Sequence, residues 1–234
     1  MAIKAVAFDL FDTLIKATAD NEACLRGIHD CLCKNGADAS YEAFLDAYRS
    51  TRTRQRKVRQ TEQREVTNIT VVCETAKLLG CELRPESQAI REAVRAYFRP
   101  WELQLMAEAM QTLEALRPLV KLGLASNFTD VSFVEEALGV LGIGGFFDSI
   151  VVSAGCGWRK PNPRIFQALL DGLGVRPGEC LFVGDDLEGD VKGSKRVGML
   201  AALLATSPTP VNSKEADFVI GSLEELVPIV GRLT

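Results

Sequence analysis

Residues 3–14 read IKAVAFDLFDTL, a short apolar run rich in β-branched residues that leads into a carboxylate at Asp9. Such a run is typical of a buried parallel strand, here Ile3–Phe8, and it places Asp9 at the carboxyl edge of the sheet. Ligands of open α/β sheets bind at that edge. Asp9 is therefore the first candidate for a functional side chain.

The same kind of apolar run recurs along the chain and alternates with segments of helical periodicity. Further strands are expected at Leu122–Ser126, Ile150–Ser153, Cys180–Gly184, Leu200–Leu204 and Phe218–Ile220. Helices are expected at Leu103–Leu116, Val131–Leu141, Pro163–Leu173 and Ser222–Val230. This alternation predicts an α/β fold with a Rossmann-like three-layer core and a parallel sheet.

Residues 17–99 break the alternation, because their apolar residues recur at helical spacing and no strand is expected among them. We expect residues 17–99 to form an all-α cap domain, inserted into a core made of residues 1–16 and 100–234. One charge run stands out, since residues 49–64 contain seven basic residues and a single acidic one, Glu62. Both a solvated helix face and a basic lip that attracts an anionic substrate fit this run.

Composition limits the classes of function. Hydrophobic residues make up 47% of the chain and charged residues 25%, which is ordinary for a folded globular protein. The net charge of −4 gives no reason to expect nucleic-acid binding, and no apolar run approaches the roughly 18–20 residues that span a membrane. Acidic residues near the N-terminus argue against a secretory signal, so we expect a cytoplasmic location. The seven cysteines lack CxxC spacing and indicate neither disulfides nor zinc.

Four short polar segments follow expected strands or loops. They are Asp9–Thr13, Ser126-Asn127, Lys160-Pro161 and Gly184–Asp190, the last reading GDDLEGD. In this order, with a helical insert after the first, they resemble the motifs of the haloacid dehalogenase-like hydrolase superfamily. The resemblance covers Ile3–Leu14 and Trp101–Leu226, and it implies a hydrolase whose cap lies between the first and second motifs.

The resemblance also implies a role for each motif. Asp9 would attack phosphorus and carry the phosphoryl group as an aspartyl-phosphate, and Lys160 would offset the negative charge. Phosphate binding is implied for Thr13, Ser126, Asn127 and Lys160. Magnesium binding is implied for Asp9, the backbone carbonyl of Phe11, Asp185, Asp186 and Asp190. The chemistry is reasonable by itself, because a carboxylate attacks an anionic phosphate only where cations offset the repulsion, and magnesium prefers hard oxygen ligands.

Phe11 departs from the family pattern, because phosphatases of this family carry an acid/base aspartate two positions after the nucleophile. Asp12, three positions along, should face away from Asp9 if the backbone continues as a strand, unless a bulge intervenes. The loss of a general acid costs typically about 10²–10⁴-fold when the leaving group needs a proton. Phe11 therefore predicts a weak phosphatase, or one suited to small anionic phosphate compounds with good leaving groups, such as acyl phosphates.

Three other functions stay open. Phe11 also fits the superfamily's 2-haloacid dehalogenases, although the carboxylates of Gly184–Asp190 would repel a haloacid unless a cation lay among them. Phosphonate hydrolysis would need a Schiff-base lysine from the insert, for which the candidates are Lys16, Lys34, Lys57 and Lys77. A non-catalytic or regulatory binding module would have no physical reason to keep three converging carboxylates beside a lysine.

Overall fold

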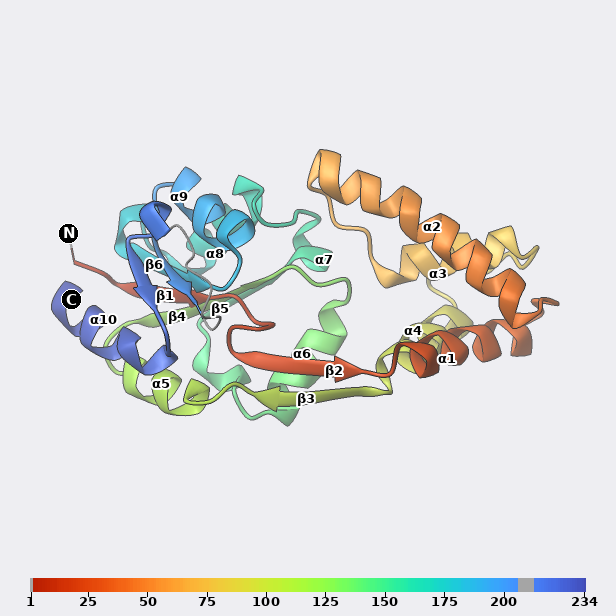
Figure 1. The fold of residues 1–234 in the computed structure, drawn as a ribbon, viewed down its shortest axis with the longest axis horizontal. Helices are drawn as coiled ribbons and strands as arrows, with labels where there is room; N and C mark the ends of the chain where they lie inside the picture. Colours follow the sequence, from red (N-terminus) through yellow and green to blue (C-terminus); the bar gives the residue numbers. More distant parts are fainter. Residues whose placement is uncertain (1, 206–212) are drawn as a thin grey trace. The chain divides into compact units, whose positions relative to one another are not determined.

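The computed structural model describes residues 2–205 and 213–234 and divides the chain into two compact units (Figure 1). The core unit comprises Met1–Ala17 and Leu103–Thr234, and the cap unit comprises Thr18–Glu102. The domain boundaries predicted above, at 16/17 and 99/100, stay a prediction. The compact units divide at 17/18 and 102/103.

A six-stranded sheet forms the middle of the core unit, in the order β5-β4-β1-β6-β7-β8. Its strands are β1 (Ala5–Phe8), β4 (Lys121–Ser126), β5 (Ser149–Val152), β6 (Cys180–Gly184), β7 (Leu200–Leu204) and β8 (Phe218–Ile220). Every neighbouring pair is parallel, as predicted. Phe8 of the central strand is in register with Leu124 and Val183, so the residues that follow β1, β4 and β6 meet at one edge of the sheet.

Helices cover both faces of this sheet, which confirms the Rossmann-like three-layer core (Figure 1). The α-helices of the core unit are α5 (Ala109–Leu116), α6 (Val131–Val140), α7 (Ser153–Cys156), α8 (Pro163–Leu173), α9 (Gly193–Arg196) and α10 (Leu226–Leu233). Shorter turns are η1 (Gly144–Phe146), η2 (Pro177–Glu179), η3 (Leu187–Lys192), η4 (Ser213–Glu215) and η5 (Leu223–Glu225). In Figure 1, α8 and α9 lie on one side of the sheet and α5 and α10 on the other.

Helix α8 shows how the sequence sets an element that carries part of the site. Asn162 caps its first turn by accepting the backbone N–H of Arg164, Pro163 supplies a fixed φ, and Gly174 ends the helix at φ 64°. Its buried face packs onto β4 and β5, and Phe166 meets Phe182 of β6 edge to face at 5.2 Å. The loop just before α8 is thereby fixed to the sheet.

The cap unit is built from four helices, as predicted for an all-α insert. They are α1 (Asn21–Lys34), α2 (Tyr41–Glu62), α3 (Asn68–Leu78) and α4 (Gln88–Phe98). Each begins after a side-chain N-cap, from Asp20, Ser40, Thr67 and Ser87 respectively. Helix α1 packs against α4, and α2 packs against α3. None of the helices within residues 2–205 and 213–234 has both the length and the apolar character that crossing a membrane requires.

Two strands were missed by the sequence analysis. β2 (Ile15–Ala19) and β3 (Trp101–Leu105) form a two-stranded sheet where the chain enters and leaves the insert. The helix predicted over Leu103–Leu116 is wrong in its first part, because α5 begins only at Ala109, after Glu108 adopts φ 68°. Side chains in β3 alternate between half-buried and exposed, as a strand requires, although Leu, Gln and Glu are good helix formers.

Candidate active site

Asp9 and Lys160 form a buried ion pair at the carboxyl edge of the sheet. Asp9 directly follows β1, its backbone N–H donates to the carbonyl of Val183 at 2.9 Å, and it is 8% exposed. The Lys160 ammonium contacts Oδ1 of Asp9 and lies 2.6 Å from Oδ1 of Asp190. One lysine thus compensates two buried carboxylates that lie far apart in the sequence.

Burial and neighbouring charges set the protonation of this pair. The pKa of Asp9 rises from 3.8 to about 7, chiefly because the group is buried; Lys160 opposes the rise, and the charges of Asp190 and Asp185 add to it. For Lys160, burial lowers the pKa, but Asp190 and Asp9 raise it more, so its pKa lies above the ordinary value. Lys160 is therefore charged at neutral pH. A further cation near Asp9 would lower the pKa of that carboxyl group and keep it ionised.

Three carboxylates converge here. One oxygen each from Asp9, Asp185 and Asp190 lies within 4.8 Å of the other two. Asp185 is exposed, and it accepts a hydrogen bond from the Thr13 hydroxyl at 3.3 Å. Burial and then Asp190 raise the pKa of Asp185, so this acidic group also gains from a cation. The donor set of hard oxygens fits a magnesium ion.

The carboxylates differ in how many of their oxygens are already engaged by other groups of the protein. In Asp190, Oδ1 pairs with Lys160 and Oδ2 accepts the backbone N–H of Asp186 at 3.1 Å. Asp186 is exposed, accepts the Glu188 N–H at 2.9 Å and so caps the turn η3, outside the three-carboxylate group. Asp9 and Asp185 are therefore the better candidates for metal ligands, with Asp190 holding Lys160.

Ser126 and Asn127, at the end of β4, provide two different polar groups. The Ser126 hydroxyl is buried and has no hydrogen-bond partner within the described part of the chain. Such a group costs stability unless a ligand satisfies it. Asn127 donates from Nδ2 to the carbonyl of Lys160 at 3.0 Å and accepts the backbone N–H of Lys160 at Oδ1, 2.7 Å away. The sequence predicted a phosphate contact for Asn127 but gave no sign of this second role.

Phe11 takes part in an aromatic column beside the site. Its ring stacks on Phe128 with centroids 4.7 Å apart, and Phe128 stacks on Phe133 at 5.2 Å. The strand assumed for the segment after Asp9 is wrong, because β1 ends at Phe8 and Asp12 has φ 63°. Asp12 is exposed, and its charge contributes to the raised pKa of Asp185. The argument that strand alternation turns Asp12 away from the site therefore does not hold.

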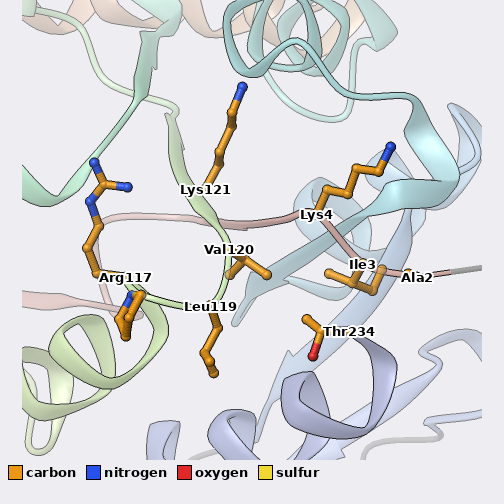
Figure 2. A pocket seen from close by; sticks show the side chains of 9 residues that line it. Ala2, Ile3, Lys4, Arg117, Leu119, Val120, Lys121 and Thr234 are labelled. Atoms are coloured by element: carbon orange, nitrogen blue, oxygen red, sulfur yellow. The ribbon is translucent and has the colours of Figure 1, made fainter.

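A separate pocket lies at the opposite edge of the sheet, around the residues that precede β1 and β4 (Figure 2). Its three cations already have partners in the core unit. Lys4 pairs with Glu179 and Arg117 with Asp148, while Lys121 donates to a backbone carbonyl at 2.8 Å. This pocket contains none of the predicted site residues.

The parallel sheet, with three carboxylates and a lysine at the carboxyl ends of its strands, is a three-layer α/β fold with a candidate site at that edge. Residues 3–198 match the sequence model of the family described as haloacid dehalogenase-like hydrolase. The chain belongs to this family. The fold, the cap insertion and the hydrolase class predicted from the sequence are confirmed.

Individual relatives agree with this assignment. The chain is 30% identical over 240 residues to the glyceraldehyde 3-phosphate phosphatase of Methanopyrus kandleri, covering 99% of this chain and 98% of that protein. Among solved structures, a 2-haloacid dehalogenase from Pseudomonas syringae pv. Tomato DC3000 has a TM-score of 0.72 at 20% identity, over 99% and 100% of the two chains. A HAD phosphatase from Thermococcus onnurineus has a TM-score of 0.63 at 26% identity, over 98% of each chain. The chain is a hydrolase of the phosphatase type.

Proposed function

We propose that this chain is a magnesium-dependent phosphatase or phosphotransferase that acts on small anionic phosphate compounds through an aspartyl-phosphate at Asp9. The observation that carries the proposal is the buried contact between Asp9 and Lys160. A buried carboxylate with a pKa of about 7 is a nucleophile whose charge must be held by cations, and phosphoryl transfer needs the same cations. The cytoplasmic location expected from the sequence stays a prediction.

The residues divide the chemistry between them. An oxygen of Asp9 attacks phosphorus, and the bond from phosphorus to the leaving-group oxygen breaks, with the electron pair leaving on that oxygen. Lys160 keeps the charge of Asp9 and of the phosphoryl group compensated, and the Ser126 hydroxyl donates to a phosphoryl oxygen. Water then attacks phosphorus and gives up a proton to solvent, the bond from phosphorus to the Asp9 oxygen breaks, and phosphate leaves as the Asp9 carboxylate is restored. Asp9 and Asp185 would hold a magnesium ion, which would supply the remaining positive charge when bound.

Phe11 sets the expected limit on this reaction. An aromatic ring stands where an acid would protonate the leaving group, and the same ring cannot take a proton from the attacking water. Leaving groups that are stable as anions, such as acetate or nitrophenolate, do not need that proton. We therefore expect faster transfer from acyl and activated aryl phosphates than from alkyl esters, and slow hydrolysis of the aspartyl-phosphate.

The relatives support the substrate class but not its details. The Methanopyrus kandleri relative is named for a small phosphate ester, which supports a small phosphate compound as substrate here. That ester is an alkyl phosphate, so the preference for good leaving groups rests on Phe11 alone. The dehalogenase likeness, at 20% identity, supports the fold, and the carboxylates of Asp185 and Asp190 disfavour a haloacid anion without a bound cation.

A stopped-flow assay tests the proposal with acetyl phosphate and p-nitrophenyl phosphate, each with magnesium and with EDTA. We expect magnesium-dependent release with an early burst, loss of all release in Asp9→Asn, and a phosphoryl group trapped on the natural protein after acid quench. The absence of release from both compounds in magnesium would contradict a phosphatase. Halide release from a 2-haloacid in EDTA would establish the dehalogenase instead.

A further inference from the structure

The loop that carries Lys160 is attached to the end of β4 by the side chain of Asn127. Its Nδ2 donates to the Lys160 carbonyl at 3.0 Å, and its Oδ1 accepts the Lys160 backbone N–H at 2.7 Å. One amide thus exchanges both hydrogen bonds with the backbone of one residue, as a paired residue does in an antiparallel sheet. The two residues are 33 positions apart in the sequence, so this link is a tertiary contact that local sequence does not supply.

Asn127 can act as a fixed point because the residues on either side of it are themselves fixed. Ser126, the last residue of β4, is paired with Val152 of β5. Phe128 donates its backbone N–H to the Ser153 hydroxyl at 2.9 Å, and its carbonyl accepts from the same hydroxyl at 3.1 Å. Ser153 is fully buried. The Asn127 amide is therefore attached to a rigid part of the core unit.

The position of the Lys160 backbone determines where its ammonium group lies. The ammonium contacts Oδ1 of Asp9 and lies 2.6 Å from Oδ1 of Asp190, and the lysine side chain is 3% exposed. A lysine stem is long and flexible, so its charged end is fixed only if its backbone is fixed as well. Hydrogen bonds weaken steeply as distance and angle change, and a misplacement of about 1 Å can cost about 10²-fold in rate.

A direct contact between the Asn127 side chain and phosphate fits the hydrogen bonds less well. Both polar atoms of its amide are already engaged by the Lys160 backbone. The Ser126 hydroxyl, one residue earlier, is buried and has no hydrogen-bond partner among residues 2–205 and 213–234. Ser126 therefore has a donor available for a ligand, whereas the Asn127 amide is used within the protein.

We propose that Asn127 is a positioning residue, whose side-chain amide holds the Lys160 backbone where the ammonium group reaches both Asp9 and Asp190. The catalytic effect of this role rests on the proposed function, because it acts through Lys160 on phosphoryl transfer. The placement of the ammonium group does not, because it is a property of the core unit without any substrate. Separate measurements therefore test the two parts.

NMR of the lysine ammonium groups measures the placement of Lys160 in the intact protein without substrate. With lysine labelled with ¹⁵N at Nζ and EDTA present, the signal that Lys160→Arg removes is assigned to Lys160. We expect Asn127→Ala to shift or broaden this signal. Ser153→Ala is the matched control, since it removes hydrogen bonds from the same loop but none from Lys160, and it should leave the signal in place.

A second variant at position 127 keeps the test decisive if Asn127→Ala does not fold. Asn127→Gln keeps the amide but moves it outward by one methylene group, so it cannot make both hydrogen bonds without moving the loop. It should therefore also shift the Lys160 signal. The proposal is overturned if neither variant changes this signal, or if Ser153→Ala changes it as much as they do.

Kinetics then show whether Asn127 acts through Lys160. With acetyl phosphate and magnesium, Asn127→Ala should lower kcat about ten- to a hundredfold. In a Lys160→Met background the same substitution should change kcat less than about twofold, because the group that it positions is gone. An equal loss in both backgrounds would mean that Asn127 acts on phosphate directly, and would overturn the proposal. If the natural protein releases no phosphate, the proposed function fails, and the Lys160 signal alone tests the position of the ammonium group.

Discussion

The ring of Phe11 stacks on the ring of Phe128, with centroids 4.7 Å apart and ring planes inclined by 16°. The position that carries an acid/base aspartate in the family's phosphatases is thus occupied by one member of an aromatic column. The stack contributes roughly 0.5–1.5 kcal/mol beyond the burial of its surface. Phe11 therefore contributes to packing at a position where the family's phosphatases have an acid/base group. Substitutions at this position can separate the effect on packing from the effect on catalysis.

Replacing Phe11 by aspartate should restore the missing acid and base while weakening the stack. We expect Phe11→Asp to raise kcat/KM for an alkyl phosphate by about 10²-fold or more, with less gain for acetyl phosphate, which needs no proton. Steady-state assays of both compounds measure this difference. Phe11→Leu is the control, since it also removes the ring but adds no carboxyl group. An equal gain in Phe11→Leu would show that ring removal, not acid catalysis, is the cause.

The charge balance around Lys160 predicts a non-additive effect on stability. Lys160→Met leaves Asp9 and Asp190 buried without their cation, which should lower the free energy of unfolding by about 3–5 kcal/mol. Adding Asp190→Asn should recover a large part of that loss, because one of the stranded charges is removed. Urea unfolding at pH 8 measures both variants. Lys192→Met, which removes the more exposed pair with Glu188, should lower the free energy of unfolding far less than Lys160→Met does.

Substitution of two adjacent aspartates, Asp185 and Asp186, tests which carboxylates bind magnesium. Magnesium that binds only the folded chain raises the unfolding temperature, by an amount that grows with its concentration relative to Kd. Asp185→Asn should reduce this rise strongly, because Asp185 belongs to the three-carboxylate group. Asp186→Asn should leave it nearly unchanged, because that side chain caps a turn. Thermal unfolding over a magnesium series decides this, and an equal loss in both variants would contradict the assignment.

Glu179 predicts a pH dependence of stability. Hydrogen bonds from the Arg176 side chain and backbone, then from Lys4, lower the pKa of Glu179 from 4.5 to about 2. Because the folded pKa is depressed, the stabilisation is present above pH 4.5 and is lost as the pH falls toward 2. The difference in unfolding free energy between the natural protein and Glu179→Gln should therefore shrink over that range. Urea unfolding at pH 6, 4 and 3 tests it, and a constant difference would contradict the ion-pair explanation.

The sheet was predictable because short, strongly apolar runs of this kind have few interpretations other than buried parallel strands. The runs at Cys180–Gly184, Leu200–Leu204 and Phe218–Ile220 are too short and too rich in apolar residues to be read otherwise, and the structure has them at those bounds. Trp101–Leu105 was missed because its residues favour helices, while pairing with β2, a contact that local propensity does not contain, makes it a strand. Local sequence cannot specify a partner that lies over eighty residues away.

The candidate site was predictable in membership but not in the details of its contacts. Four polar segments at strand ends indicated Asp9, Lys160 and Asp185, because parallel strands bring their carboxyl ends together. The sequence did not show that Asp190 would pair with Lys160 while Asp186 capped a turn.

Two hydrogen bonds between the Asn127 side chain and the backbone of Lys160 bear on which parts of this chain can diverge in evolution. They tie the lysine loop to the end of β4, so the position of the ammonium group is determined inside the core unit. The reacting groups are then preorganised before any compound arrives. Under the proposed mechanism, the helices of the cap unit are free to diverge and alter which compound is accepted, while the chemistry at Asp9 stays the same.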